Sequence, residues 1–337
     1  MNFWKDLPKP FFVLAPMEDV TDAAFRQLIA SKSKDGIPRV LYTEFTSADG
    51  LIRAPEEGRR KLLKKLEYAP IERPIVAQLF TSNVDHMEQG ARLCAELGFD
   101  GFDINMGCPD KSIEKQQCGS ALIKNPPLAR ALIRAAKRGA CTCASQACTS
   151  ETCMPVSVKT RIGYNTDELS TWLPELLAEE PAVVIIHART RKEMSDVPAR
   201  WEHVAHAVRI RDELGSKTLI VGNGDVKNVD DARAKAAVTG ADGVMIGRGV
   251  FGNPWLFAER ELPPSPAERM QALIDHIELF QRHLSGFTSD AVMKRHFKAY
   301  IGGWDGAAEL RGRLMECSDL SDARAVLIAE LQRSIAM

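Results

Sequence analysis

Eight short apolar segments, each followed by a stretch of helical periodicity or by a loop, constrain the fold of this chain most strongly. The predicted strands are Phe11–Ala15, Arg39–Thr43, Pro74–Gln78, Gly101–Asn105, Val156–Thr160, Ala182–His187, Thr218–Gly222 and Gly243–Ile246. Most are β-branched or apolar throughout, as expected of parallel strands covered by helices. The predicted helices are Thr21–Ala30, Val84–Leu97, Leu128–Arg138, Glu168–Glu179, Trp201–Leu214 and Val229–Thr239, with a less regular basic segment at Pro55–Tyr68. Eight such units over about 250 residues predict an α/β fold of the (β/α)8 TIM-barrel type. An open doubly wound sheet is the alternative, but no GxGxxG motif follows an early strand.

The pattern changes after the proline cluster Pro263-Pro264-Ser265-Pro266. Beyond it the chain shows only helical periodicity, over Arg269–His283, Asp290–Tyr300, Ala307–Met315 and Asp319–Ile335. A proline-rich segment between two differently patterned regions is typical of a linker. We therefore expect a barrel domain at residues 1–260 and a small helical-bundle domain at residues 267–337.

Composition limits the classes of protein to be considered. With 45% hydrophobic residues in a chain of 337, a disordered or fibrous protein is excluded. There is no apolar run of the roughly 18 residues that a membrane-spanning helix needs, and the N-terminus does not resemble a secretion signal. We therefore expect a cytoplasmic protein, with a monomer slightly preferred. The 44 Lys+Arg balance 45 Asp+Glu, so RNA binding would need a local patch such as Lys294, Arg295 and Lys298.

The residues at the carboxyl ends of the eight strands are unusually polar. Going round the predicted barrel, they are Pro16 and Met17, Glu44, Gln78, Asn105, Lys159 and Arg161, His187 with Arg189 and Arg191, Asn223-Gly224-Asp225, and Gly247-Arg248-Gly249. A single polar residue at a strand end is usually an ordinary turn residue. Eight strand ends of this kind indicate a functional rim at the mouth of the barrel, where barrel enzymes place their chemistry.

The rim residues indicate the kind of ligand. Glycines after the seventh and eighth strands can form a phosphate cradle, and Arg248 can add a charge-assisted contact. Lys159 and Gln78 are expected to face the mouth, where they could contact the polar edge of a flavin ring. A cation near that edge stabilises the anionic reduced flavin. No metal-ligand constellation is apparent at the mouth, which favours redox chemistry on an organic cofactor.

Several motifs resemble those of the tRNA-dihydrouridine synthase family, and look closest to its bacterial branch. The most specific is DINMGCPDKSIEKQQCGSALIKNP, at residues 103–126. The others are APMEDVTD (15–22), VAQLF (76–80), VSVKTRIG (156–163), IHARTRKEM (186–194), VGNGDV (221–226), DGVMIGRGVFGNPW (242–255), MKRHFKAYIGG (293–303) and GAAELRGRL (306–314). They occur in the family's order and cover nearly the whole chain.

This resemblance implies an enzyme that reduces the C5–C6 bond of chosen uridines in tRNA. NADPH, with NADH left open, would reduce bound FMN, and hydride from the flavin would reach C6 of uracil. Cys108 would donate a proton to C5, and a thiol of pKa about 8.5 on a turn after a strand suits that role. The implied FMN contacts are Pro16, Met17, Glu18, Gln78, Lys159, His187, Asn223, Gly224, Asp225, Gly247 and Arg248. The implied substrate contacts near the base are Arg161, Arg189 and Asn105, although Asn105 could instead order the Cys108 loop. Lys294, Arg295 and Lys298 are the implied contacts with tRNA phosphates.

Two segments depart from the family pattern. The family has a Tyr-x-Gly-x-Ala-Asp-Trp pattern here, and residues 194–201 keep its tryptophan as Trp201 but not its tyrosine or glycine. Because this loop is expected to lie near the substrate, the choice of uridine stays open. Residues 140–153 look like an insertion carrying Cys141, Cys143, Cys148 and Cys153. Four thiols there could bind Zn²⁺ or an iron–sulfur cluster, although the spacing of the cysteines does not match the C-x2-C pattern of common zinc sites. The alternative is a loop of reduced thiols without a metal. A helix-to-strand loop lies opposite the barrel mouth, so such a metal would not take part in uridine reduction.

Two other functions remain as hypotheses. A small-molecule flavin reductase of the dihydroorotate or enoate class would not need the helical tail. An RNA-binding or chaperone-like protein would require a damaged flavin site, whereas every motif position is intact. The sequence favours the tRNA-modifying enzyme over both.

Overall fold

The computed structural model describes residues 2–34, 36–141, 153–260 and 263–336. Its centre is a closed barrel of eight parallel strands, in which β2 pairs with β4 and β9 pairs with β1. These strands are β1 (Phe11–Leu14), β2 (Arg39–Tyr42), β4 (Ile75–Phe80), β5 (Gly101–Met106), β6 (Val156–Arg161), β7 (Val183–His187), β8 (Leu219–Asn223) and β9 (Gly243–Ile246). The predicted TIM barrel is confirmed, and each predicted strand end lies within two residues of the observed one.

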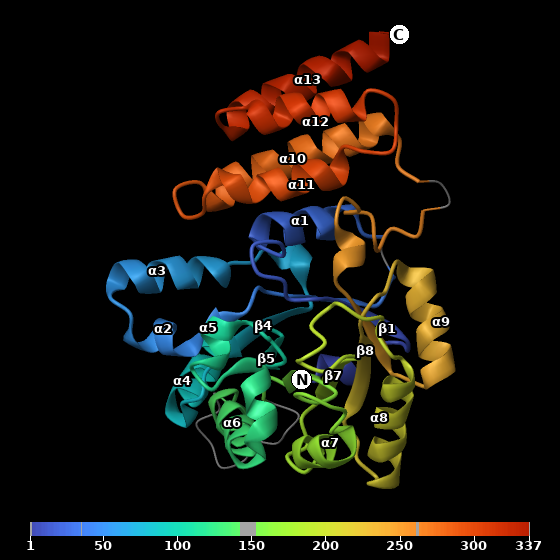
Figure 1. The fold of residues 1–337 in the computed structure, drawn as a ribbon. Helices are drawn as coiled ribbons and strands as arrows, with labels where there is room; N and C mark the ends of the chain where they lie inside the picture. Colours follow the sequence, from blue (N-terminus) through green and yellow to red (C-terminus); the bar gives the residue numbers. More distant parts are fainter. Residues whose placement is uncertain (1, 35, 142–152, 261–262, 337) are drawn as a thin grey trace.

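Helices cover the outside of the barrel (Figure 1). Those predicted from periodicity are α1 (Ala23–Lys32), α4 (Val84–Glu96), α6 (Pro126–Gly139), α7 (Leu169–Leu177), α8 (Glu202–Glu213) and α9 (Val229–Thr239). Helix α4 begins where expected because the side chain of Asn83 accepts a hydrogen bond from the backbone N–H of His86 at 3.0 Å. Helix α1 begins two residues later than expected, since Asp22 is its N-cap.

The segment between β2 and β4 is more elaborate than the sequence indicated. It contains the short strand β3 (Thr46–Ser47), which pairs with β4, and two helices, α2 (Ala48–Arg53) and α3 (Glu56–Lys65). Helix α3 has no buried residue, so it lacks the apolar stripe by which a helix is recognised in sequence. The remaining short elements are α5 (Lys111–Glu114) and the 3₁₀ turns η1 (Phe3–Lys5), η2 (Pro70–Glu72), η3 (Gly119–Lys124), η4 (Arg248–Val250) and η5 (Asp290–Val292).

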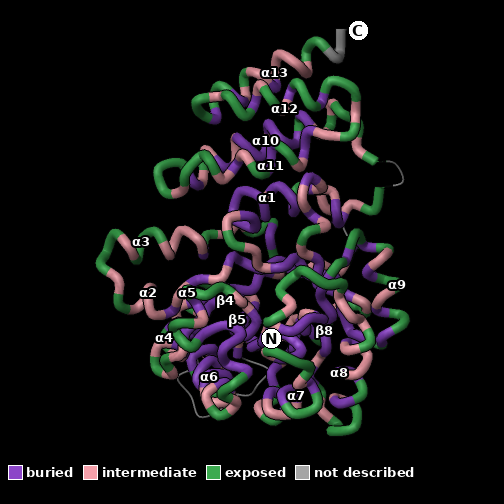
Figure 2. The backbone as a smooth tube through the Cα atoms, in the orientation of Figure 1, coloured by how far each residue is buried: buried purple, intermediate pink, exposed green. Residues whose placement is uncertain are grey.

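Alternate residues of each strand pack on opposite sides of the barrel wall. On β7, Val184 and Ile186 pack outward in the large core beneath the helices, while Val183 and Ile185 belong to a second cluster inside the barrel. Trp4 joins this inner cluster. Figure 2 shows the strands as almost continuously buried. The inner face of β5 and β6 is polar instead, and this exception leads to the site described below.

The C-terminal part is helical, as predicted. It consists of α10 (Pro266–Leu284), α11 (Met293–Tyr300), α12 (Ala307–Glu316) and α13 (Leu320–Ala336), stacked beyond α1 in Figure 1. Helix α10 starts with a capping box formed by Ser265 and Glu268. The ring of Phe25 on α1 lies 5.0 Å from that of His276 on α10, so an aromatic contact joins the barrel to these helices. Among the described helices, none is long and apolar enough to cross a membrane.

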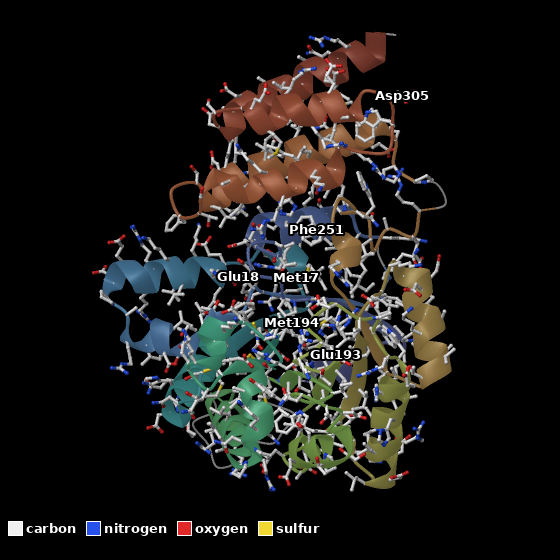
Figure 3. The ribbon with its side chains drawn as sticks, viewed as in Figure 1. Met17, Glu18, Glu193, Met194, Phe251 and Asp305 are labelled. Carbon is white, nitrogen blue, oxygen red and sulfur yellow. A yellow bond between two sulfur atoms is a disulfide. The ribbon has the colours of Figure 1, made fainter. Side chains whose placement is uncertain are left out.

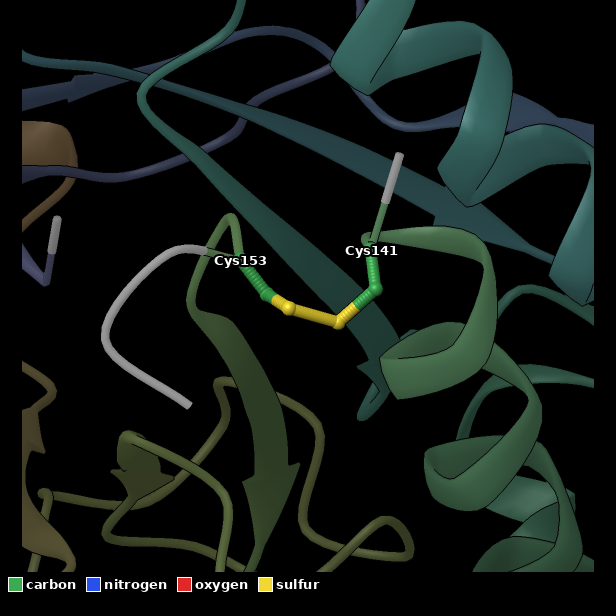
Figure 4. Close-up of a disulfide and its surroundings, with 2 residues drawn as sticks. All are labelled: Cys141 and Cys153. Atoms are coloured by element: carbon green, nitrogen blue, oxygen red, sulfur yellow. A yellow bond between two sulfur atoms is a disulfide. The ribbon is translucent and has the colours of Figure 1, made fainter. Parts of the chain in front are cut away.

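The cysteine-rich segment differs from the prediction of a four-thiol metal site. Cys141, just after α6, and Cys153, just before β6, form a disulfide (Figure 4). A sulfur in a disulfide is not available as a thiolate ligand, so this pair is a cross-link here and not half of a metal site. Cys143 and Cys148 lie outside the described residues. As expected, the cross-link lies between a helix and the strand that follows it, away from the carboxyl ends of the strands.

Candidate active site

A cavity of about 240 Å³ lies at the carboxyl ends of the strands, inside the mouth of the barrel. The residues that line it lie in the last part of β6, β7 and β8 or in the loops after β1, β7, β8 and β9: Ala15, Pro16, Met17, Lys159, His187, Arg189, Ser195, Asn223, Gly224, Asp225, Val226, Gly247 and Arg248. Most of them were predicted as site residues from their places after the strands. Figure 3 shows Met17 and Met194 on the side of the barrel nearest the helical region in that view.

Asp225 links two arginines at one wall of the cavity. Its carboxylate forms ion pairs with Arg189 and with Arg248, the latter at 2.6 Å. The hydrogen bond from Arg189 is the main reason that the pKa of Asp225 falls to about 2. Arg189 is 2% exposed, and its Nε also donates to the carbonyl oxygen of Val197 at 2.6 Å. Arg189 therefore braces the wall, whereas Arg248 stays largely exposed at the rim.

His187 is neutral, and its tautomer follows from its partner. Burial, followed by the charges of Lys159, Arg161, Arg189 and Arg248, lowers its pKa well below the ordinary value. Nη1 of Arg189 lies 3.1 Å from Nε2 of His187. Because a guanidinium can only donate, Nε2 is the acceptor and the proton of the neutral ring is on Nδ1.

Lys159 is the lysine in the lining of the cavity. Burial, followed by the charge of Arg161, lowers its pKa to about 8, while Asp103 acts in the opposite direction. The amine is therefore mostly protonated at neutral pH, although much less firmly than an exposed lysine.

The cavity is suited to an anionic ligand. Lys159, Arg189 and Arg248 contribute three positive charges to its lining and Asp225 one negative charge, which leaves a net charge of +2. A Cβ added to Gly247 would lie 3.6 Å from both the Cβ of Ala15 and the Sδ of Met17, which also line the cavity. Glycine at this position therefore keeps the space beside Ala15 and Met17 free of a side chain.

Cys108 lies on a turn that two neighbouring segments fix. Oδ1 of Asn105 accepts hydrogen bonds from the backbone N–H groups of Gly107, at 3.1 Å, and Cys108, at 2.9 Å. The carbonyl oxygen of Cys108 accepts from both N and Oγ of Ser120, at 3.0 Å each. Gly119 has a φ of +61°, and a Cβ on it would lie 2.6 Å from that same carbonyl oxygen. These contacts explain why the G-C-P and G-S-A-L sequences occur together.

The thiol of Cys108 is half-buried. Burial is the largest influence on it and raises its pKa, against the lowering influence of Lys159 and Arg161. The protonated form therefore predominates at neutral pH. The turn places a thiol that can give up a proton beside Lys159, which lines the cavity.

Known proteins were compared with the chain as a whole. The family model for dihydrouridine synthase matches residues 13–336. A "Probable tRNA-dihydrouridine synthase" of Staphylococcus aureus (strain COL) is 38% identical over 331 residues, covering 97% of this chain and 94% of that protein. A "Probable tRNA-dihydrouridine synthase 2" of Bacillus subtilis (strain 168) is 39% identical over 328 residues, covering 97% and 95%. The chain belongs to the dihydrouridine synthase family.

The chain also shares its fold with distant solved structures. A 2-naphthoyl-CoA reductase complex matches it with a TM-score of 0.51 at 12% identity, covering 75% of this chain and 52% of that one. Such a likeness supports the barrel and nothing finer. Membership of the family shows that the protein is an oxidoreductase, as the sequence predicted.

Four residues expected at the cavity of this synthase lie elsewhere. Gln78 is fully buried and its amide bonds to Asp103 and Asn105, so it does not face the mouth. Asn105 is not among the lining residues, but its Oδ1 accepts from the Cys108 turn, which is the second of the two roles expected of it. Glu18 points to α3, where it pairs with Lys65.

Arg161 holds two loops together and does not reach the open mouth. Its Nε donates to the carbonyl oxygen of Gly107 at 2.8 Å. Its Nη1 donates to the carbonyl oxygens of Thr190, at 3.0 Å, and Met194, at 2.9 Å. Arg161 is 5% exposed, and its guanidinium donates to three backbone carbonyls. These hydrogen bonds link the loop after β5 to the loop after β7.

The basic residues of α11 are used in different ways. Arg295 forms an ion pair at 3.6 Å with Asp19, which follows β1 at the rim of the barrel. Lys298, one turn further along, is exposed. Lys294 donates to the carbonyl oxygen of Met315 at 3.1 Å, so it contacts the end of α12. Of these three, Arg295 reaches the rim beside the mouth.

Trp201, the aromatic residue kept after β7, has a structural role in this synthase. Its Nε1 donates to the carbonyl oxygen of Gly224 at 2.9 Å, which ties the loop after β7 to the loop after β8. Counted back from Trp201, Ser195 and Val197 stand where the family pattern has tyrosine and glycine, and the loop exposes Met194 and Val197. The loop is thus anchored at its end while its exposed part differs from the family pattern.

Sequence reasoning missed the polar groups inside the barrel. Asp103 on β5 is fully buried, as is Tyr42 on β2. Oγ of Ser157 on β6 donates to Oδ1 of Asp103 at 2.5 Å and lies 3.1 Å from the hydroxyl of Tyr42. The available signal was the alternation of Asp103 and Asn105 on one strand, which places both side chains on the same face.

Proposed function

We propose that this dihydrouridine synthase reduces the C5–C6 bond of uridines in tRNA, with FMN in the mouth cavity and NADPH as the reductant. The observation that carries the proposal is a protonated thiol, Cys108, on a turn next to Lys159, which itself lines a cavity of net positive charge. The relatives named as tRNA-dihydrouridine synthases, which match along nearly the whole chain, support the substrate.

The lining residues fit FMN. Arg248 and the backbone at Gly224 and Gly247 would hold its phosphate, while Lys159 and His187 would lie against the ring system. When bound and reduced, FMN supplies the hydride that saturates C6 of uracil. A cationic Lys159 at the ring favours its anionic reduced state, and a neutral His187 adds no second charge there.

Cys108 acts as the general acid. Its thiol is protonated at neutral pH because burial raises its pKa, so it can donate a proton to C5 of uracil. The turn that carries it is held on one side by Asn105 and on the other by Ser120, which fixes where the proton is delivered.

The tRNA would approach over the rim beside α11. A uridine must leave the base stack to reach the mouth of a barrel. Arg295 and Lys298 lie on one face of α11, and Arg295 already contacts the rim at Asp19, so their charges are placed for contacts with tRNA phosphates. Lys294, which is bonded to α12, is less suited to this role.

The test is formation of dihydrouridine on an unmodified tRNA transcript by the purified full-length chain. FMN and either NADPH or NADH are supplied, and nucleosides are analysed by mass spectrometry for the gain of two hydrogens. We expect product with the wild type and a loss of about 10² in rate or more for Cys108→Ala, with FMN still bound. A protein that neither retains FMN nor forms dihydrouridine with any tRNA would overturn the proposal.

A further inference from the structure

A buried chain of hydrogen bonds runs from the barrel interior to the Cys108 turn. Nε2 of Gln78 donates to Oδ2 of Asp103 at 2.7 Å. Nδ2 of Asn105 donates to Oε1 of Gln78 at 3.1 Å, and Oδ1 of Asn105 accepts from the backbone of Gly107 and Cys108. Gln78 lies opposite Asp103 in the β4–β5 register, so the sheet itself aligns the first link.

We infer that Asp103 is a positioning residue for Cys108, acting through Gln78 and Asn105. The inference rests on the proposed function, in which Cys108 is the proton donor. It adds that a residue buried inside the barrel keeps this donor in position. Asp103 contacts neither the mouth cavity nor Cys108 directly.

The groups at the two ends of the chain fix the direction of each hydrogen bond. Oδ2 of Asp103 accepts from Gln78 and Oδ1 accepts from Ser157, so Gln78 presents its NH₂ group to Asp103 and its oxygen to Asn105. Asn105 must then donate with its NH₂ group, which leaves its oxygen facing the Cys108 turn. The turn offers two backbone N–H groups and requires an acceptor there. A single orientation of the Gln78 and Asn105 amides therefore satisfies both Asp103 and the Cys108 turn. We call Asp103, Gln78 and Asn105 the relay.

Burial makes this orientation matter. Asp103 and Gln78 are 0% exposed and Asn105 is 5% exposed, so water is not at hand to replace a lost partner. Burial raises the pKa of Asp103 to about 7, against the hydrogen bonds from Ser157 and Gln78 and the charge of Lys159. A carboxyl buried at this cost inside the barrel has a role that an apolar residue would not fill.

Two substitutions test the relay. Asp103→Asn keeps the shape but can present either an oxygen or an NH₂ group to Gln78, so the amides are no longer fixed. Asp103→Leu leaves Nε2 of Gln78 without its acceptor and removes the buried carboxyl. The matched control is Tyr42→Phe, because the Tyr42 hydroxyl belongs to the same buried cluster but lies beyond Ser157, on the far side of Asp103 from the turn.

Two readouts on the full-length protein separate this inference from the proposed function. The first is the rate of Cys108 alkylation by iodoacetamide, followed by mass spectrometry of the Cys108 peptide, and it needs neither cofactor nor tRNA. The second is the split between kcat and KM for tRNA. A displacement of about 1 Å can cost about 10² in rate, so we expect kcat to fall at least about tenfold in both Asp103 variants, with KM changed less than about threefold. We expect the alkylation rate to rise at least about threefold as the turn loosens.

A double-mutant cycle with Asn105→Ala completes the test. If Asp103 acts through Asn105, then Asp103→Asn adds little to the effect of Asn105→Ala, whereas independent effects would multiply. Asp103 variants that match Tyr42→Phe in kcat and in alkylation would overturn the inference. If the wild type makes no dihydrouridine while alkylation of Cys108 still depends on Asp103, the proposed function fails and the relay stands.

Discussion

Replacing Gly119 with alanine perturbs the Cys108 turn at one defined contact. A Cβ on Gly119 would lie 2.6 Å from the carbonyl oxygen of Cys108, which is closer than real Cβ contacts. That oxygen also accepts the two hydrogen bonds from Ser120. The added methyl group must therefore move the carbonyl away, and with it the turn that carries the thiol.

The size of the effect follows from the structure. Alanine at a φ of +61° costs about 1–2 kcal/mol, and each lost hydrogen bond about 0.5–1.5 kcal/mol. Gly119→Ala should thus lower the free energy of unfolding by about 2–5 kcal/mol. Gly215 is the matched control, because it has a φ of +63° with nothing within 4 Å of an added Cβ. Gly215→Ala should cost only the backbone contribution of about 1–2 kcal/mol.

Denaturant unfolding of both variants, with dihydrouridine formation measured alongside, checks this reasoning. We expect Gly119→Ala to be the less stable by about 1–3 kcal/mol and to lose most of its activity, while Gly215→Ala keeps its activity. Equal destabilisation of the two variants would show that the close approach to Cys108 contributes nothing. Full activity in a folded Gly119→Ala protein would show that the turn does not need its observed geometry.

Three further measurements follow from the structure. Because the pKa of Lys159 is lowered to about 8, its amine loses its charge as the pH rises through that value. Fluorescence titration should therefore show that FMN affinity weakens above about pH 8 in the wild type and does not change with pH in Lys159→Met. Arg26 and Glu72 form an ion pair with both side chains fully buried, so Arg26→Leu should cost about 3–5 kcal/mol in unfolding free energy, and a loss below 1 kcal/mol would contradict the pairing. The Cys141–Cys153 disulfide closes a loop with a sequence separation of 12 residues, so the double serine variant should be about 2–3 kcal/mol less stable than the oxidised wild type, with the difference abolished by reductant and kcat unchanged.

The barrel and most of the cavity lining could be predicted because parallel strands share one end. Apolar runs mark the strands, and the residues after β8 and β9 must then lie together with those after β6 and β7. Asn223, Asp225 and Arg248 were found in this way. Helix α3 was not recognised clearly, because a helix without a buried face carries no apolar period.

Gln78 shows where the same reasoning fails. The sequence predicted that its strand ends at Gln78, whereas β4 continues to Phe80. Two more residues of strand put Gln78 below the rim, where Asp103 and Asn105 take up its amide. Arg161 fails for a different reason, since its partners are backbone carbonyls of the loops after β5 and β7, and no residue type in the sequence marks them.

The thiol and the cationic cavity place opposing demands on the same region. Lys159 lies opposite Asn105 in the β5–β6 register, so the cation that suits an anionic ring stands beside the turn carrying Cys108. Lys159 and Arg161 both lower the pKa of the thiol, and an exposed cysteine between them would tend toward thiolate, which cannot donate a proton. Burial outweighs both charges and raises the pKa instead. A thiol that is to stay protonated beside cations therefore has to be kept half-buried. The hydrogen bonds of Asn105 and Ser120 to the turn, and the close approach of Gly119 to it, hold the thiol in that position.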